Sequence, residues 1–188
     1  MSAVFLSEVT VEFERTDTFR RLDITFFNPE KLAAIQKLER GCGEILSLTD
    51  VLAERPGTGK TPATAEYVRA SEGVPIIKVA NLSPRFFVEW EPLAFAPKSY
   101  YESSAKGRLK KHDILLLCAA HHSGYIGLNT SIVAEMAYDT ALHVGELIRL
   151  RVNEDEIDPH YLTALLNHEA LRSFTGPRAA VACGNNER

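Results

Sequence analysis

Two helix starts of the same kind bracket a long β-prone segment of this chain. An N-cap side chain stands directly before a proline in Asn28-Pro29 and again in Asp158-Pro159. Both pairs are typical of the first residues of a helix. The apolar spacing after each pair predicts one helix over about residues 28–40 and a second over about residues 158–175.

The segment between the helices, about residues 45–152, is rich in short runs of strand-forming residues. These runs are separated by Gly, Pro, Asn and Ser and cover residues 76–82, 86–90, 113–120, 130–136 and 145–152. Residues 115–118 have no polar alternation, so we expect them to be buried on both faces of a sheet. The alternation in residues 147–152 predicts a half-exposed strand. The pattern therefore predicts an α+β fold: one domain over residues 1–188, with a β-rich core bracketed by an N-terminal and a C-terminal helix.

Charge is distributed unevenly along the chain. The net charge is −4, yet residues 60–125 carry nine basic and six acidic side chains, and both flanking parts are acidic. A basic face on an acidic body suits a nucleic-acid binder that relies on partner subunits or on a second domain for full affinity. A solvated fluctuation of charge is the alternative interpretation.

The first candidate loop reads Gly57-Thr58-Gly59-Lys60-Thr61 and stands at the start of the basic part. It is similar to the end of a nucleotide-binding loop, but that loop needs a glycine where this chain has Glu54, and a helix where Pro62 follows. We expect instead that Lys60 contacts a phosphate or a guanine of DNA and that Thr61 contacts a phosphate. An ordinary surface turn remains the alternative.

Further basic and polar residues lie in two later segments. Lys106 and Arg108 precede a predicted strand and are expected to bind backbone phosphates, with a lysine-protected sheet edge as the alternative. Beyond that strand, the side chains of a second loop can donate to base edges or phosphates. These are His121, His122, Ser123 and Tyr125. Adjacent histidines on extended chain point apart, and no metal-ligand spacing accompanies them, so no metal site is expected.

Three more candidate DNA contacts lie in or just after the predicted strand 76–82. They are Lys78, Asn81 and Arg85. Lys78 and Asn81 are three residues apart and fall on opposite faces of a regular strand, so at most one of the two reaches a groove unless a bulge intervenes.

The order of these segments resembles the target recognition domain of the specificity subunit in bacterial type I restriction-modification systems. The resemblance covers about residues 21–174. Its parts are an N-terminal helix, a Gly-Lys-Thr-Pro loop followed by Tyr67, the runs GVPIIKVANL and LKKHDILLL, and a C-terminal helix. It implies a DNA-binding module that contributes specificity while separate subunits methylate and cleave. The implied partners are double-stranded DNA, the methyltransferase subunit and the restriction subunit, with a homodimer or a second recognition domain completing the site.

Motifs for catalysis are missing from the sequence. There is no Asn/Asp-Pro-Pro-aromatic motif of an adenine methyltransferase, no acidic residue two positions before a lysine as in common nucleases, and no Gly-x-Ser-x-Gly elbow. We therefore expect a binding module that is not an enzyme and needs no cofactor. The alternatives are the recognition domain of a fused DNA methyltransferase, a protein-interaction module for an acidic partner, and a small nucleotide-binding enzyme built on Lys60 and Thr61.

Location is predicted from what the sequence lacks. No apolar run approaches the roughly 20 residues that cross a membrane, and the first residues lack the basic start of a signal peptide. Three cysteines at widely separated positions fit a reducing compartment. We expect a cytoplasmic protein.

Overall fold

The computed structural model describes residues 33, 36, 40, 46–120 and 125–168. The chain divides into two units, Met1–Leu46 and Ser47–Arg188. In the first unit, Ala33, Gln36 and Arg40 are helical, as the first predicted helix requires at these positions. The rest of that helix lies outside the described residues, and everything below concerns the second unit.

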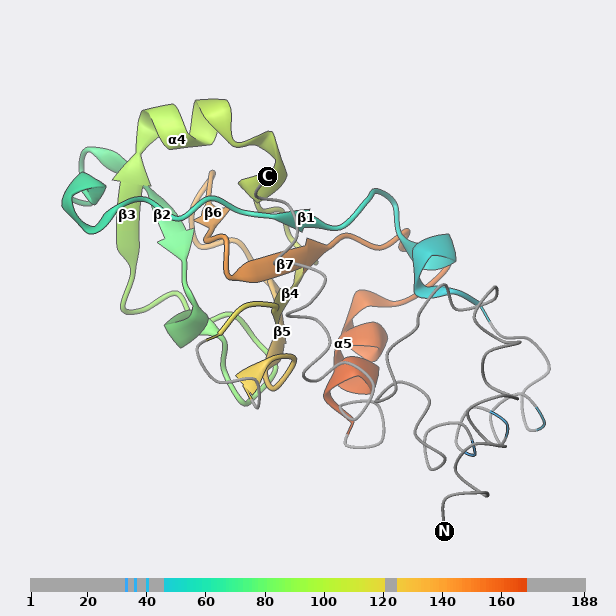
Figure 1. Cartoon of the computed structure of the whole chain (residues 1–188). Helices are drawn as coiled ribbons and strands as arrows, with labels where there is room; N and C mark the ends of the chain where they lie inside the picture. The colour runs from blue at the N-terminus through green and yellow to red at the C-terminus, as the bar shows by residue number, and fades with distance from the viewer. Residues whose placement is uncertain (1–32, 34–35, 37–39, 41–45, 121–124, 169–188) are drawn as a thin grey trace, which may run out of the picture. The chain divides into compact units, whose positions relative to one another are not determined.

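Short strands and helices make up the second unit, as Figure 1 shows. The strands are β1 (Gly57–Thr58), β2 (Gly73–Ile77), β3 (Ala94–Pro97), β4 (Ile114–Leu117), β5 (Thr130–Ile132), β6 (Leu142–His143) and β7 (Leu147–Leu150). The α-helices are α4 (Lys98–Ser103) and α5 (Pro159–Asn167), and the 3-10 helices are η1 (Leu48–Val51), η2 (Thr64–Glu66), η3 (Val79–Asn81) and η4 (Ala105–Gly107). The predicted α+β class with a β-rich core is confirmed.

The strands form two sheets. One has the order β1-β7-β4-β5 with antiparallel neighbours, and the other has the order β3-β2-β6, in which β2 and β6 are parallel. β7 and β4 are central in the first sheet and pair Leu115 with Arg149. The two-residue strand β1 is added to the outer side of β7, which places the Gly57 loop at a sheet edge.

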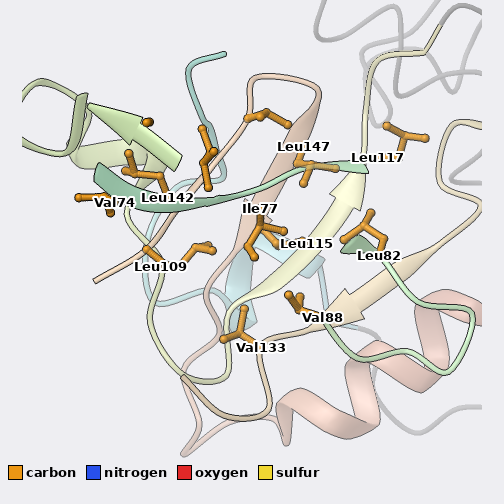
Figure 2. Close-up of a cluster of buried hydrophobic side chains, with 14 residues drawn as sticks. Val74, Ile77, Leu82, Val88, Leu109, Leu115, Leu117, Val133, Leu142 and Leu147 are labelled. Carbon is orange, nitrogen blue, oxygen red and sulfur yellow. The ribbon is translucent and has the colours of Figure 1, made fainter. Parts of the chain in front are cut away.

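Apolar side chains fill both faces of the larger sheet. Leu115, Leu117 and Leu147 join a core that also contains the buried face of β2 (Figure 2). Ile114 and Leu150 point to the opposite face, where Leu162 and Leu166 of α5 cover them. Because both faces of β4 are covered, the prediction that its run is doubly buried is confirmed, although Leu116 is only half-buried.

Two predicted strands differ from the structure. The run over residues 76–82 leaves the sheet after Ile77 and continues as η3. Residues 86–90 form only isolated bridges, Leu82 with Val88 and Phe87 with Ile132. Phe86 has φ of 73°, a left-handed backbone that interrupts a regular strand.

The strand β7 and the helix α5 also depart from expectation. β7 is not half-exposed: the Arg149 side chain is 4% exposed, because the strand lies between β1 and β4. The predicted start of α5 is confirmed, with the Asp158 carboxylate accepting hydrogen bonds from the backbone N–H of His160 (2.7 Å) and Tyr161 (3.0 Å). The helix is shorter than predicted and ends at Asn167, where His168 is extended. Among the described residues, no helix is both long enough and apolar enough to cross a membrane.

Candidate nucleic-acid interface

Close packing against the β6–β7 turn holds the Gly57–Thr61 loop in place. The Gly59 backbone passes so near His143 that a Cβ atom at position 59 would lie 1.8 Å from the His143 carbonyl oxygen. Only glycine permits this approach. Two residues further on, the Thr61 hydroxyl donates to Glu146 Oε2 (2.6 Å) and accepts from the Gly145 N–H (2.9 Å). Lys60 is therefore held between two anchored neighbours.

These contacts correct the role predicted for Thr61. Its hydroxyl hydrogen is donated to Glu146, so it is not available to a phosphate. Thr61 instead fixes the loop that presents Lys60. The nucleotide-binding alternative also fails, because Gly57 and Thr58 form a strand and the short 3-10 helix η2, not an α-helix, follows the loop.

Lys60 and Lys78 each lie over a tyrosine ring. The Lys60 ammonium is 4.7 Å from the centroid of Tyr100, and the Lys78 ammonium is 4.7 Å from the centroid of Tyr67. Such cation-π contacts hold a flexible lysine in one orientation, at an exposed site by about 0.5–1 kcal/mol. Two lysines that are 18 residues apart in the sequence thus occupy defined positions on aromatic side chains.

A carboxylate joins the two lysine–tyrosine pairs. Glu66 Oε2 accepts hydrogen bonds from the Tyr100 hydroxyl (2.6 Å) and from the Ala63 N–H (2.7 Å), and Tyr67 follows Glu66 directly in the chain. These two hydrogen bonds, and then the positive charge of Lys60, lower the pKa of Glu66. The hydrogen bond to Glu66 raises the pKa of Tyr100. We name this set of five residues the lysine–tyrosine strip: Lys60, Glu66, Tyr67, Lys78 and Tyr100.

Asn81 does not present its side chain to a ligand, contrary to prediction. It is 2% exposed, and its amide nitrogen donates to the backbone oxygens of Glu89 (3.0 Å) and Pro92 (2.9 Å). Its Oδ1 accepts from the Lys78 N–H (2.9 Å). Asn81 is thus buried and structural, and it fixes the backbone from which Lys78 reaches Tyr67.

The basic residues around η4 divide into two kinds. Lys106 is exposed and lies beside the first loop, since its Cβ is 3.4 Å from a Cβ placed on Gly57. Arg108 is half-buried: its guanidinium lies 4.5 Å from the Tyr101 ring centroid and donates to the Tyr101 (2.9 Å) and Glu102 (3.2 Å) carbonyls. Arg108 therefore stabilises the end of α4. Its side chain is engaged within the domain, which corrects the phosphate contact predicted for it.

An open pocket of about 630 Å³ lies between the residue that follows Lys78 and the flanks of the second predicted loop. Val79 on its wall follows Lys78, and Glu146 on its wall holds Thr61. Tyr125, which is 57% exposed, also lines it from the far end of the second predicted loop. The other lining residues are Leu82, Leu117, Ala119, Ala120, Leu128 and Asn129. The flanks of the second loop thus lie beside the residue that follows Lys78.

Three other predicted contacts, His121, His122 and Ser123, lie outside the described residues. Arg85 is exposed in the turn before Phe86, and no contact within the described part of the chain joins it to the lysine–tyrosine strip. No group of three or more His, Cys, Asp or Glu side chains in the described segments is arranged to hold a metal ion.

A partly buried network of charges ties the segment before the first loop, and Asp113 before β4, to β7. Arg149 pairs with Glu54, which also accepts from Arg151 NH1 (2.9 Å). Arg151 forms two further hydrogen bonds of 2.7 Å to Asp113. Burial disfavours the charged form of Arg151, but Asp113 and Glu54 outweigh that effect and raise its pKa. Glu54 thus neutralises two arginines, one in β7 and one directly after it.

The network also reaches the backbone of residues 108–110, which follow Lys106. Arg149 NH1 donates to the Arg108 carbonyl, and Asp113 Oδ2 accepts from the Lys110 N–H (2.7 Å). Glu54 precedes the first loop in the chain. The same ion pairs therefore fix the segment that precedes Lys60 and the backbone that follows Lys106, a link that no sequence pattern indicates.

The fold and this site define a small α+β domain with a surface strip of two lysines, two tyrosines and one carboxylate. No family model and no curated protein sequence matches the chain. Several solved chains are similar to it, among them the following two. The first is the HsdS subunit from Thermoanaerobacter tengcongensis, 17% identical, with a TM-score of 0.49 and a match over 92% of this chain and 41% of that one.

The second is a chain from a structure that concerns complex assembly and conformational transition of the type I restriction-modification system. It is 15% identical, with a TM-score of 0.45 and a match over 86% of this chain and 39% of that one. The present chain therefore spans about two fifths of the length of either similar chain.

Proposed function

We propose that this chain is a sequence-specific DNA-binding module of a type I restriction-modification system. In this role it directs separate methyltransferase and endonuclease subunits to a target site and performs no catalysis itself. The order of its sequence segments, which resembles that of a target recognition domain, supports the proposal. The observation that carries it is the convergence of Lys60 and Lys78 on one aromatic strip, with Lys106 beside the same loop.

The chemistry of the strip fits a duplex. Ammonium groups bind phosphate oxygens and supply affinity that does not depend on sequence. Tyrosine hydroxyls and a carboxylate can hydrogen-bond to base edges, which is where sequence is read. A face with both kinds of group suits a reader of sequence better than a purely basic face, which would bind any duplex.

The small number of exposed cations on this face favours binding together with a partner. Arg108, Arg149 and Arg151 are engaged within the domain and contribute little to a phosphate surface. We therefore infer that full affinity needs the methyltransferase subunit, and a second recognition domain or a homodimer that reads the other half of a split site. Such an assembly would work in the cytoplasm.

Selection from a pool of random duplexes, with the cognate methyltransferase subunit present, tests the proposal. We expect a defined sequence motif to be enriched over successive rounds. The matched control is the double variant Lys60→Ala, Lys78→Ala, which should enrich the motif poorly while keeping the unfolding midpoint of the parent. Recovery of no motif by the parent protein would contradict the proposal, and binding of acidic proteins in place of duplex would favour the interaction-module alternative.

A further inference from the structure

The lysine–tyrosine strip contains one carboxylate, that of Glu66. A surface that only binds phosphate has no use for a carboxylate. The Glu66 side chain is exposed, and one oxygen, Oε2, takes both of its hydrogen bonds, from the Tyr100 hydroxyl and the Ala63 N–H. Among the described residues, no hydrogen bond ends on the other oxygen, Oε1. Glu66 is thus fixed through one oxygen and offers a second acceptor to solvent.

The ionised Glu66 side chain can accept hydrogen bonds but cannot donate one. The Tyr100 hydrogen bond, the Ala63 N–H and the charge of Lys60 all lower its pKa, so the carboxylate is ionised near neutral pH. An ionised carboxylate repels phosphate, and it cannot pair with the acceptor atoms N7 and O6 of guanine. It accepts strongly from amino groups, which cytosine and adenine display in the major groove.

The two lysines do not cancel this carboxylate through direct ion pairs. Lys60 and Lys78 lie over the Tyr100 and Tyr67 rings, each at 4.7 Å from the centroid. The strip therefore presents a negative acceptor, held by Tyr100, together with the two lysines that lie over Tyr100 and Tyr67. On a duplex, such a pattern matches a base edge with an amino group, flanked by the phosphates of the backbone.

We propose that Glu66 determines specificity by accepting a hydrogen bond from the exocyclic amine of a cytosine or adenine in the target sequence. This inference rests on the proposed function and assigns the base-reading group within the strip. Tyr100 acts as a positioning residue, because its hydroxyl holds the Glu66 carboxylate in place. Lys60 and Lys78 supply affinity without discriminating between bases.

The test compares the motifs that the full chain and its variants select from random duplexes with the methyltransferase subunit present. We expect the parent motif to contain a position restricted to cytosine or adenine, and the recovered base distinguishes the two amines. Glu66→Gln should lose the preference at that position alone, about tenfold in relative affinity, because an amide both accepts and donates. The control Glu156→Gln, an exposed carboxylate in the turn before α5, should leave the motif unchanged.

A second measurement changes the DNA. In the selected duplex, the preferred base is replaced by the same base without its exocyclic amine, and binding by the parent protein is measured by titration. We expect about a tenfold loss of affinity for the parent and no further loss for Glu66→Gln. A parent motif that Glu66→Gln leaves intact, or an amine-free duplex bound as tightly as the original, overturns this inference while the proposed function stands. A parent that selects no motif overturns both.

Discussion

The Arg149 guanidinium is paired with Glu54, which lies in the segment before the first loop. Arg149 lies in the centre of a sheet and is only 4% exposed. A buried cation of this kind is stabilising only while its partners are in place. Arg149 also donates to the Arg108 carbonyl, so a single side chain of β7 holds both basic segments. The geometry of the proposed interface therefore depends on an ion pair that lies beneath it.

Removing the charge of Glu54 should destabilise the domain. In Glu54→Gln the Arg149 charge stays buried with a weaker acceptor, and we expect the free energy of unfolding to fall by about 2 kcal/mol. Urea denaturation followed by circular dichroism measures the change. Glu156→Gln removes an equal charge from an exposed turn and should change stability by less than about 0.5 kcal/mol. Equal effects of the two variants would show that the network contributes nothing to stability.

Stability should also depend on pH through His143, which lies under the Gly59 loop. Burial lowers the pKa of His143 from 6.5 to about 4 in the folded protein. The unfolded state then binds more protons between pH 6.5 and 4, so the free energy of unfolding falls as the pH drops through this window, by up to about 3 kcal/mol. Above pH 6.5 the histidine is neutral in both states and has no effect.

Replacing the imidazole tests this dependence. His143→Gln should flatten the dependence of unfolding free energy on pH between 6.5 and 4, while the exposed His160→Gln should retain the slope of the parent. Chemical denaturation at several pH values measures both. A parent slope that survives in His143→Gln would place the responsible proton on another group.

Local chemistry explains which parts of the fold could be predicted from the sequence. The Asp158 cap and the unbroken apolar run of β4 act within a few residues, and both are confirmed. The positive φ of Phe86 and the turn of residues 79–81 into a 3-10 helix depend on pairing with distant segments. Such elements have no sequence signal of their own, so a continuous strand was predicted in their place.

The candidate site shows the same division. Lys60 and Lys78 could be identified because a glycine-bearing basic loop and a lysine at a strand end are visible in sequence. Residue type alone, however, could not separate exposed cations from internal ones, and Arg108 and Asn81 were assigned to DNA although they bond to the domain's own backbone. Glu66 and Tyr100 became candidates only when folding brought η2 and α4 together.

The close approach of Gly59 to His143 should make any larger side chain costly. In Gly59→Ala the new Cβ would meet the His143 carbonyl oxygen at 1.8 Å, so the loop must shift. We expect a loss of about 2 kcal/mol in the free energy of unfolding and weaker duplex binding, because Lys60 moves with the loop. Gly57→Ala is the matched control, since its nearest contacts are at 3.4 Å. If both variants are as stable as the parent, the packing of the loop is looser than described.

The salt dependence of duplex affinity distinguishes lysines that bind phosphate from surface lysines that do not contact the DNA. Each phosphate contact contributes about 0.9 to the slope of log affinity against log salt concentration. Lys60→Ala and Lys78→Ala should therefore each reduce the magnitude of that slope by about 1, measured by fluorescence anisotropy on the selected duplex. The control is Lys111→Ala, which removes the same charge from an exposed ion pair with Glu135 (2.6 Å) and should leave the slope unchanged. Because all three variants lose one positive charge, a general effect of net charge would alter the three slopes alike, and that result would contradict phosphate binding at the strip.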